Sequence, residues 1–259
     1  MAPKPKQPKT TREEDSLHDF SQSSPIIPES RNIHDHRRSG LSVYTSNPET
    51  FPKSIVVRHT ADFVVINDLY PKSSIHLLVL PRNQQKTLLH PFAAFDGSDT
   101  DFLESVKAEC RVAKQLAASE LRRRFGKQSL LDRAREDALS SQIEPDSDSE
   151  LPTGRDWAAS IMVGVHAVPS MSNLHIHVIS VDRFSERLKH RKHYNSFATS
   201  FFVPLSDLPL AADDPRRQPG REGYLKMDFK CWRCGREFGS RFAQLKLHLE
   251  EEFEEWKRE

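Results

Sequence analysis

The chain has 259 residues, a formal net charge of +1, 36% hydrophobic residues and 29% charged residues. This length allows one large domain or two small ones, and the hydrophobic share is low for a wholly compact protein, so we expect disordered parts. Three cysteines and the lack of any apolar run near the roughly 20 residues that span a bilayer predict a soluble protein of a reducing compartment, with no membrane among its partners.

The N-terminus reads MAPKPKQPKTTR and is rich in lysine and proline, without the apolar core of a signal peptide. Residues 1–38 show no sustained period and are rich in proline, serine and charge. They predict a disordered basic leader, with the first ordered domain beginning at residue 39. The basic arm favours nuclear localisation, with the cytoplasm as the alternative.

Strands dominate the beginning of the ordered part. The stretch SIVVRHTADFVVINDLYPKSSIHLLVLP, residues 54–81, contains three short β-rich runs separated by turn residues, which is typical of antiparallel strands. From Thr100 to Phe125 apolar residues recur at intervals of three and four, which predicts an amphipathic helix. Its expected buried face consists of Phe102, Val106, Cys110, Ala113 and Leu116. Cys110 is then a buried apolar residue rather than a reactive thiol.

An acidic, serine-rich stretch follows this helix, and residues 136–154 predict a mobile insertion. Two further strands, 159–169 and 173–180, follow the insertion, and the first domain ends at residue 204. Residues 205–222 are rich in proline and aspartate and predict a linker. A second, chemically distinct module occupies residues 223–259.

The second of these strands contains SNLHIHVIS, residues 172–180. Because side chains alternate between the two faces of a strand, Asn173, His175 and His177 project to one face and the intervening apolar residues to the other. One face is therefore polar and the other belongs to the core. An isolated His-x-His pattern often lines only a polar sheet face, so other segments must support a catalytic reading.

Three matched segments provide that support. HAVPSMSNLHIHVIS, read with the upstream VINDLYPKSSIHLLVLP and the downstream LKHRKHYNSF, resembles the histidine-triad nucleotide hydrolases, and within them the aprataxin family. The family motif is His-φ-His-φ-His-φ-φ, with φ apolar, and this chain departs from it at Asn173. The resemblance implies an α+β histidine-triad (HIT-like) fold with an antiparallel sheet and helices, in which residues 39–204 are the catalytic domain. It also implies a short form without the forkhead-associated domain of longer relatives.

The resemblance assigns the nucleophile to His175 and a phosphate contact to His177. Imidazole is largely unprotonated near neutrality and can attack phosphorus to form a phosphoramidate, which water then hydrolyses. His177, if protonated, would offset charge on the nonbridging oxygens. The Asn173 amide can donate and accept hydrogen bonds at the supporting position but carries no charge. No metal is required at this catalytic site.

The resemblance also implies further contacts with the nucleotide. Asp68 accepts hydrogen bonds from the ribose hydroxyls, and His76 points toward the same site. His166 lies near the leaving group. The alternatives are an ordinary aspartate before a turn and, for His76, a satisfied half-buried core histidine.

Phosphate contacts are the remaining implied roles. Ser170 and Ser172 are expected around the phosphate, and both could equally be turn residues. Lys192 and His193 belong to a cationic cluster at residues 189–193 and are expected beside the phosphates. Such a basic run is otherwise a solvated face.

The C-terminal module contains Cys231-x2-Cys234, then thirteen residues to His248, and Glu252 four positions later. This is the spacing of a ββα zinc finger in which a glutamate replaces the second histidine, and Glu is an acceptable zinc ligand. Glu251 could compete as the ligand, and a redox Cys-x2-Cys is the alternative. The small finger core is expected from Phe238, Phe242 and Leu245.

Basic residues surround the predicted zinc site. They are Arg233, Arg236, Arg241 and Lys246. They predict contact with a nucleic-acid backbone without much sequence preference, so residues 223–259 are interpreted as a DNA-binding finger of the C2HE type.

The resemblance therefore implies an enzyme that removes AMP from the 5′-phosphate of adenylated DNA left by aborted ligation, through a His175–AMP intermediate. A structural zinc ion is the expected cofactor, nicked or double-stranded DNA the partner and AMP the product, with DNA repair proteins as further partners. One alternative is a general nucleotide phosphoramidate or dinucleoside-polyphosphate hydrolase. Another is a catalytically inactive DNA-end binding module, for which Asn173 is the clue.

Overall fold

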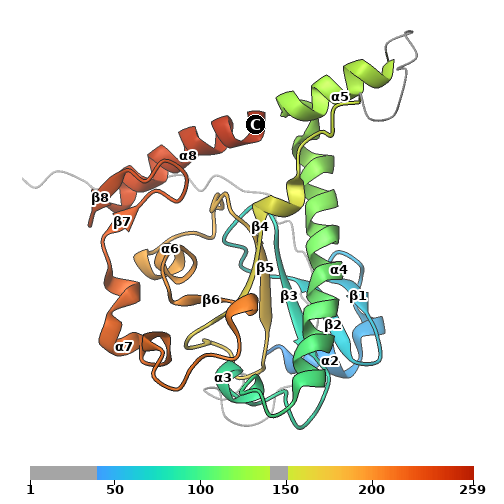
Figure 1. The fold of residues 1–259 in the computed structure, drawn as a ribbon, viewed down its shortest axis with the longest axis vertical. Helices are drawn as coiled ribbons and strands as arrows, with labels where there is room; N and C mark the ends of the chain where they lie inside the picture. The colour runs from blue at the N-terminus through green and yellow to red at the C-terminus, as the bar shows by residue number, and fades with distance from the viewer. Residues whose placement is uncertain (1–39, 141–150) are drawn as a thin grey trace, which may run out of the picture. The chain divides into compact units, whose positions relative to one another are not determined.

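The computed structural model describes residues 40–140 and 151–259, so the leader predicted at 1–38 and most of the acidic insertion lie outside the described residues. Six strands form one antiparallel sheet in the order β1-β2-β3-β5-β4-β6 (Figure 1). The strands are β1 (Val56–His59), β2 (Phe63–Asn67), β3 (His76–Pro81), β4 (Ile161–His166), β5 (Ile176–Ser180) and β6 (Phe202–Pro204). The predictions of three strands within residues 54–81 and of two later strands are confirmed.

Helix α4 (Thr100–Phe125) has the predicted bounds and packs against the apolar face of the sheet. The Asp99 side chain caps its first turn by accepting a hydrogen bond from the Phe102 N–H at 3.0 Å. One predicted core position is wrong, because Leu116 is 38% exposed. Ala117 is buried instead, since a spacing of four residues from Ala113 follows the sheet-facing stripe of the helix.

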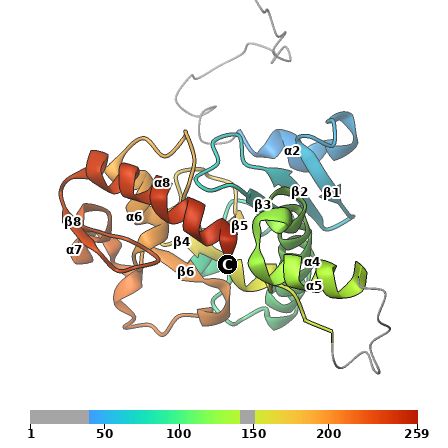
Figure 2. The same ribbon diagram turned by 90° about the horizontal axis from the view of Figure 1, so that it is seen from above.

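Helix α6 (Arg191–Ala198) lies on the opposite face of the sheet from α4, as Figures 1 and 2 show. Its Phe197 packs against the rings of His76, His166 and His177. The polar face of the sheet is therefore partly covered by a helix that starts in the cationic cluster.

Helix α5 (Leu130–Ser140) includes the first residues of the segment predicted as a mobile insertion, so that boundary was wrong. The helix is fixed at its beginning by the buried carboxylate of Asp132. This carboxylate accepts hydrogen bonds from Trp157 Nε1 at 2.8 Å and from the Arg155 N–H at 3.0 Å. Residues 141–150 lie outside the described residues.

The connection predicted as a linker at 205–222 is folded onto the catalytic domain. It contains the short helices η5 (Leu205–Asp207), η6 (Pro215–Arg217) and α7 (Pro219–Glu222). Leu208 and Leu210 are buried in the main core. The remaining short helices are α2 (Ser42–Ser46), η1 (Pro48–Thr50), α3 (Pro91–Ala94), η2 (Gly126–Gln128), η4 (Trp157–Ser160) and η7 (Tyr224–Lys226). Among the described residues, no helix is long and apolar enough to cross a membrane.

The C-terminal module consists of a hairpin, β7 (Phe229–Lys230) and β8 (Glu237–Gly239), and helix α8 (Phe242–Arg258). Phe238 and Leu245 are buried in its core as predicted, Phe242 is partly buried, and Leu188 and Tyr194 of the catalytic domain join them. The far end of α8 approaches α5 (Figure 2), and its Phe253 and Trp256 belong to the main core. The finger and the catalytic domain therefore share two hydrophobic clusters.

Candidate active site and metal centre

Four histidine rings gather on the polar face of the sheet. His177 on β5 is their centre because β3 and β4 flank β5, with Leu78 and Gly164 as its cross-strand partners. The ring centroids of His166, His175 and His76 lie 4.3, 4.9 and 5.2 Å from that of His177. Strands β3, β4 and β5, with His175 just before β5, thus supply one cluster, as expected for His76, His166, His175 and His177.

Gly164 makes room on this face. A Cβ at this position would lie 2.3 Å from the Val203 carbonyl oxygen and 2.7 Å from the Phe202 ring. Only glycine lets β6 approach β4 this closely, so that the Phe202 ring can cover the sheet beside His166.

His175 is oriented by its own chain. Its Nδ1 lies 2.7 Å from the backbone carbonyl oxygen of Asn173, and since a carbonyl only accepts, Nδ1 carries the proton and donates. Nε2 is therefore the nitrogen with the free lone pair. Burial lowers the pKa of His175, which keeps the ring neutral at physiological pH. The arrangement suits a nucleophile.

A chain of hydrogen bonds fixes His177. The Lys72 backbone N–H donates to His76 Nδ1 at 3.3 Å, so His76 carries its proton on Nε2 and donates to His177 Nδ1 at 2.9 Å. His177 then carries its own proton on Nε2, which is buried and has no hydrogen-bond partner among the described residues. His177 can therefore donate a hydrogen bond to a phosphate oxygen.

Burial shapes the charge of the cluster. It lowers the pKa of His76 to about 4 and that of His166 to about 3, and holds the pKa of His177 well below its usual range. The expectation of a protonated His177 is corrected accordingly, since the ring is a neutral donor. Nearby positive charge comes instead from Lys72, which adds to the lowering of all three pKa values.

Sequence reasoning missed Lys72, which it treated only as part of a turn. The residue precedes β3 by four positions, and this proximity to His76 was the available signal. Its neighbour Asp68 accepts a hydrogen bond from the Tyr70 N–H at 2.7 Å through one oxygen. The other oxygen lies 3.3 Å from His76 Nδ1, so the residue expected at the ribose borders the histidine cluster.

The Asn173 side chain does not follow the alternation predicted for it. The strand starts only at Ile176, and Asn173 precedes it. Its amide is buried and lines a separate pocket with Arg82 and Thr87. Neither amide atom has a hydrogen-bond partner among the described residues.

The other expected phosphate contacts lie around the site. Ser170 and Ser172 are exposed in the connection from β4 to β5. Lys192 is exposed in the first turn of α6, and His193 Nδ1 accepts a hydrogen bond from the Lys189 N–H at 3.1 Å. Burial and then the charge of Lys72 lower the pKa of His193. The same lysine lowers the pKa values of three clustered histidines, so His193 lies close enough to the site to share its electric field.

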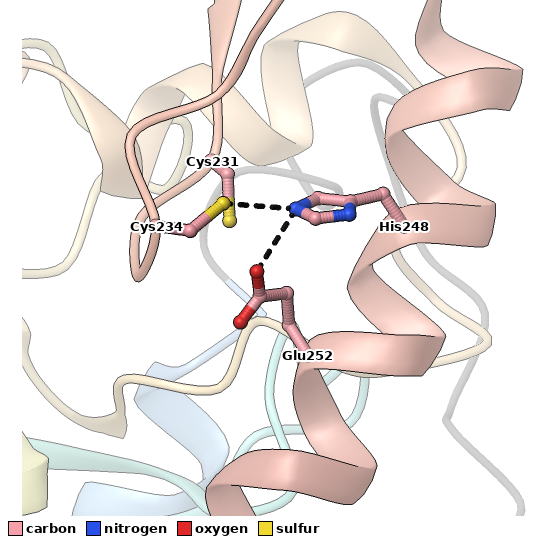
Figure 3. Close-up of side chains that lie close together, drawn as sticks. All are labelled: Cys231, Cys234, His248 and Glu252. Atoms are coloured by element: carbon pink, nitrogen blue, oxygen red, sulfur yellow. Dashed lines mark hydrogen bonds and ion pairs between the residues drawn. The ribbon is translucent and has the colours of Figure 1, made fainter.

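The four predicted metal ligands converge in the finger (Figure 3). Ligand atoms of Cys231, Cys234, His248 and Glu252 all lie within 4.8 Å of one another. His248 Nε2 lies 3.1 Å from Cys234 Sγ and 3.1 Å from Glu252 Oε1. Glu251 is 78% exposed, with its carboxylate 3.7 Å from the other ring nitrogen, so Glu252 is the residue that completes the cluster.

This set of donors fits a zinc ion. Two thiols, an imidazole and a carboxylate form a tetrahedral Zn²⁺ donor set. Desolvation, then hydrogen bonding with Glu252 and Cys231, raise the pKa of the Cys234 thiol to about 11. Arg233 Nη1 donates to Glu252 Oε2 at 2.7 Å, leaving Oε1 toward the cluster.

Comparison with known proteins agrees with both halves of the chain. Residues 50–184 match the family described as HIT domain, and residues 198–255 match the C2HE / C2H2 / C2HC zinc-binding finger. An aprataxin-like protein of Saccharomyces cerevisiae is 37% identical over 219 residues, covering 83% of this chain and 95% of the relative. One of Schizosaccharomyces pombe is 34% identical, covering 85% and 82%.

The chain belongs to the aprataxin-like family. It is thus a histidine-triad hydrolase of the DNA-repair type, with an α+β HIT domain and a C-terminal zinc finger, as the sequence predicted. A crystal structure of the aprataxin ortholog Hnt3 in complex with DNA has a TM-score of 0.64 and 31% identity, over 85% of this chain and 96% of that one. A structure titled Hnt3 in complex with DNA and guanosine has a TM-score of 0.63.

Within this aprataxin-like fold, one predicted role in the finger needs correction. Arg233 contacts Glu252 and Glu259, so it stabilises the metal site rather than being free for nucleic acid. Arg241 donates to the Phe238 carbonyl oxygen through Nε while remaining exposed, so its contact with nucleic acid stays a prediction. Arg236 is exposed and Lys246 half-buried, and both remain candidates for a phosphate contact.

Proposed function

We propose that this protein removes AMP from 5′-adenylated DNA ends, through a covalent His175–AMP intermediate. The observation that carries the proposal is the hydrogen bond from His175 Nδ1 to the Asn173 carbonyl, which leaves the Nε2 lone pair for attack. Nε2 bonds to the phosphorus of the adenylate, and the bond from that phosphorus to the bridging oxygen breaks. The electron pair leaves with the DNA 5′-phosphate. Water then cleaves the P–N bond and releases AMP.

The surrounding groups suit this sequence. His177 Nε2 has no partner among the described residues, and in this proposal it donates to a nonbridging oxygen, where charge develops in the transition state. Lys72 supplies a positive charge beside the cluster, and Asp68 offers a carboxylate for the ribose hydroxyls. His166 packs among Phe197, Phe201 and Phe202, and in this proposal it lies toward the leaving group.

DNA as the substrate is supported by the basic surface and by the finger. Exposed cations at Lys189 and Lys192 lie at the start of α6, which covers the histidine face. The titles of two similar structures name DNA as the bound partner. The finger would hold zinc through Cys231, Cys234, His248 and Glu252. Nuclear localisation, expected from the basic leader, completes this proposal.

The test is release of AMP from adenylated nicked DNA by the purified protein. Wild-type protein is expected to release AMP and leave a 5′-phosphate, and acid quenching during turnover should trap AMP on His175, seen by peptide mass spectrometry. His175→Ala should abolish both signals, whereas Asn173→Ala should only slow the reaction, because its backbone carbonyl remains. Full turnover by His175→Ala would refute the mechanism. Adenylated DNA that binds but is never cleaved would favour an inactive end-binding module.

A further inference from the structure

A second pocket lies beside the histidine site and takes no part in the mechanism above. Its volume is about 550 Å³, and it opens between α2 and the segment that follows β3. Most of the residues that line it have a polar group, among them Thr45, Ser46, Arg82, Gln84, Thr87 and Asn173. Among the described residues of the lining, Arg82 is the only charged one, so the pocket favours an anion.

Asn173 is the buried element of this pocket. Its residue surface is only 2% exposed, yet neither Nδ2 nor Oδ1 has a hydrogen-bond partner among the described residues. A buried amide left unpaired costs free energy, so an amide lining a pocket indicates a ligand or ordered water that satisfies it. Nδ2 requires an acceptor, and Oδ1 can accept from the hydration shell of an anion.

Two hydrogen bonds to backbone carbonyls orient Arg82 in the lining of the pocket. Its Nε donates to the Thr45 carbonyl oxygen at 2.9 Å, and its Nη1 donates to the Thr60 carbonyl oxygen at 2.9 Å. These bonds fix the plane of the guanidinium. Nη2 makes no hydrogen bond with any of the residues that the structure describes. The hydroxyl groups of Thr45, Ser46 and Thr87 already donate to backbone carbonyls, so the anion would be bound by Arg82 and Asn173.

One residue joins this pocket to the nucleophile. The backbone carbonyl of Asn173 fixes the His175 ring, while its side chain lines the pocket. Two residues of extended chain separate the Cα atoms of Asn173 and His175 by at most about 7 Å. The pocket therefore adjoins the site at which His175 attacks phosphorus.

We infer that this pocket binds the first internucleotide phosphodiester of the adenylated DNA strand. The inference rests on the proposed function and names the part of the substrate that the pocket recognises. A phosphodiester carries a single negative charge and two acceptor oxygens, which match Arg82 and the Asn173 Nδ2. Small adenylates have no such group, so the pocket distinguishes a polynucleotide from them. A phosphodiester bound there also contacts Asn173, whose backbone carbonyl orients His175.

The test uses two adenylated strands that differ at one linkage. In one the first internucleotide linkage is a phosphodiester, and in the other it is an uncharged methylphosphonate. The measured quantity is the ratio of kcat/KM for the two strands, determined for each protein. The wild-type ratio should be about tenfold or more, as expected for a buried hydrogen bond to a charged group. A methylphosphonate at the third linkage should have a much smaller effect.

Two sets of variants test the pocket independently, one by removing the Asn173 amide and one by changing the charge at Ser46. Asn173→Leu removes the amide and keeps the backbone carbonyl, and its ratio should fall to about one or two. Ser46→Glu places a carboxylate in the lining and should lower the ratio by repelling the charged linkage. Ser46→Gln, which has nearly the same shape without the charge, should keep the wild-type ratio. Because Ser46 is exposed, both of its variants are expected to fold. They therefore test the inference even if Asn173→Leu fails to fold.

The possible failures are distinguishable. If wild-type protein releases AMP equally well from both strands, the pocket does not bind this phosphodiester, and the proposed function stands. An equal loss with Ser46→Glu and Ser46→Gln would also overturn the inference, because charge would not be the cause. If wild-type protein releases no AMP from either strand, the proposed function itself is wrong.

Discussion

Phe253 of helix α8 stacks on Phe184, with ring centroids 4.1 Å apart and planes 10° from parallel. Phe184 follows the end of β5 by four residues, so this contact joins the finger helix to the strand that carries His177. Arg155 adds to the junction, since its guanidinium lies over the Trp157 ring at 4.1 Å and the Trp256 ring at 4.8 Å. The finger and the catalytic domain are therefore expected to unfold together.

Replacing Phe253 tests this coupling. Phe253→Ala removes a side chain that is only 7% exposed, and should lower the free energy of unfolding by about 3 kcal/mol or more. Leu247→Ala, on the same helix but 64% exposed, should cost about 0.5 kcal/mol or less. Urea unfolding followed by circular dichroism measures both. Similar midpoints for the two variants would contradict the shared core.

The position of Arg233 predicts an effect on metal binding without loss of a ligand. Because Arg233 holds Glu252 Oε2, Arg233→Gln should weaken zinc binding by about tenfold to a hundredfold. Arg236→Gln is the matched control, since Arg236 lies over the Phe238 ring. Competition with a zinc chelator gives the affinities. Equal affinity in both variants would remove Arg233 from the metal site.

The fourth ligand can be tested directly. Glu252→His should retain zinc, and Glu252→Ala should bind it more weakly, because only three donors remain. Glu251→Ala should resemble the wild-type protein, since that carboxylate is exposed. Zinc content after dialysis measures the outcome. A loss of zinc in Glu251→Ala rather than in Glu252→Ala would reassign the ligand.

The buried histidines make folding stability depend on pH. Burial lowers the pKa of His76 to about 4 and of His166 to about 3, whereas the unfolded chain titrates near 6.5. Protons therefore bind the unfolded state first, and stability present above pH 6.5 is lost as pH falls toward 4. Each such histidine contributes a slope of up to about 1.4 kcal/mol per pH unit.

Urea unfolding at a series of pH values between 7 and 4.5 measures this slope. His166→Phe should reduce it by the share of one histidine, because the phenylalanine remains among the rings that surround His166. His190→Asn is the control, since His190 is exposed. A slope that His166→Phe leaves unchanged would show that His166 titrates normally in the folded protein.

Salt should weaken the reaction on adenylated DNA. If Lys192 contacts a phosphate, Lys192→Gln should raise KM and reduce the slope of log(kcat/KM) against log[salt] by about one. Lys114→Gln, on the helix that covers the opposite face of the sheet, should match the wild-type protein. These point variants are preferable to deletion of residues 223–259, which would also remove Phe253 and Trp256 from the main core. Identical salt slopes for both variants would remove Lys192 from the DNA surface.

Local patterns in the sequence predicted the regular elements well. The helix at 100–125 was given by apolar spacing and the strands by β-rich runs between turns, because both periods are properties of the local backbone. Leu116 shows the limit of this reasoning, since the interval of three or four residues admits either Leu116 or Ala117. The sheet decided between them.

The sequence by itself determined the chemical groups of the two sites. His175 and His177 share a face because strand side chains alternate, and His248 and Glu252 share one because residues four apart on a helix are neighbours. Only the tertiary structure decided that His76 donates to His177, that Lys72 places a positive charge near the histidines and that Asn173 lines another pocket. It also placed Arg233 on Glu252 and made the finger part of the main core. These features depend on strand register and burial, which bring together residues up to a hundred positions apart or more, and no local period encodes them.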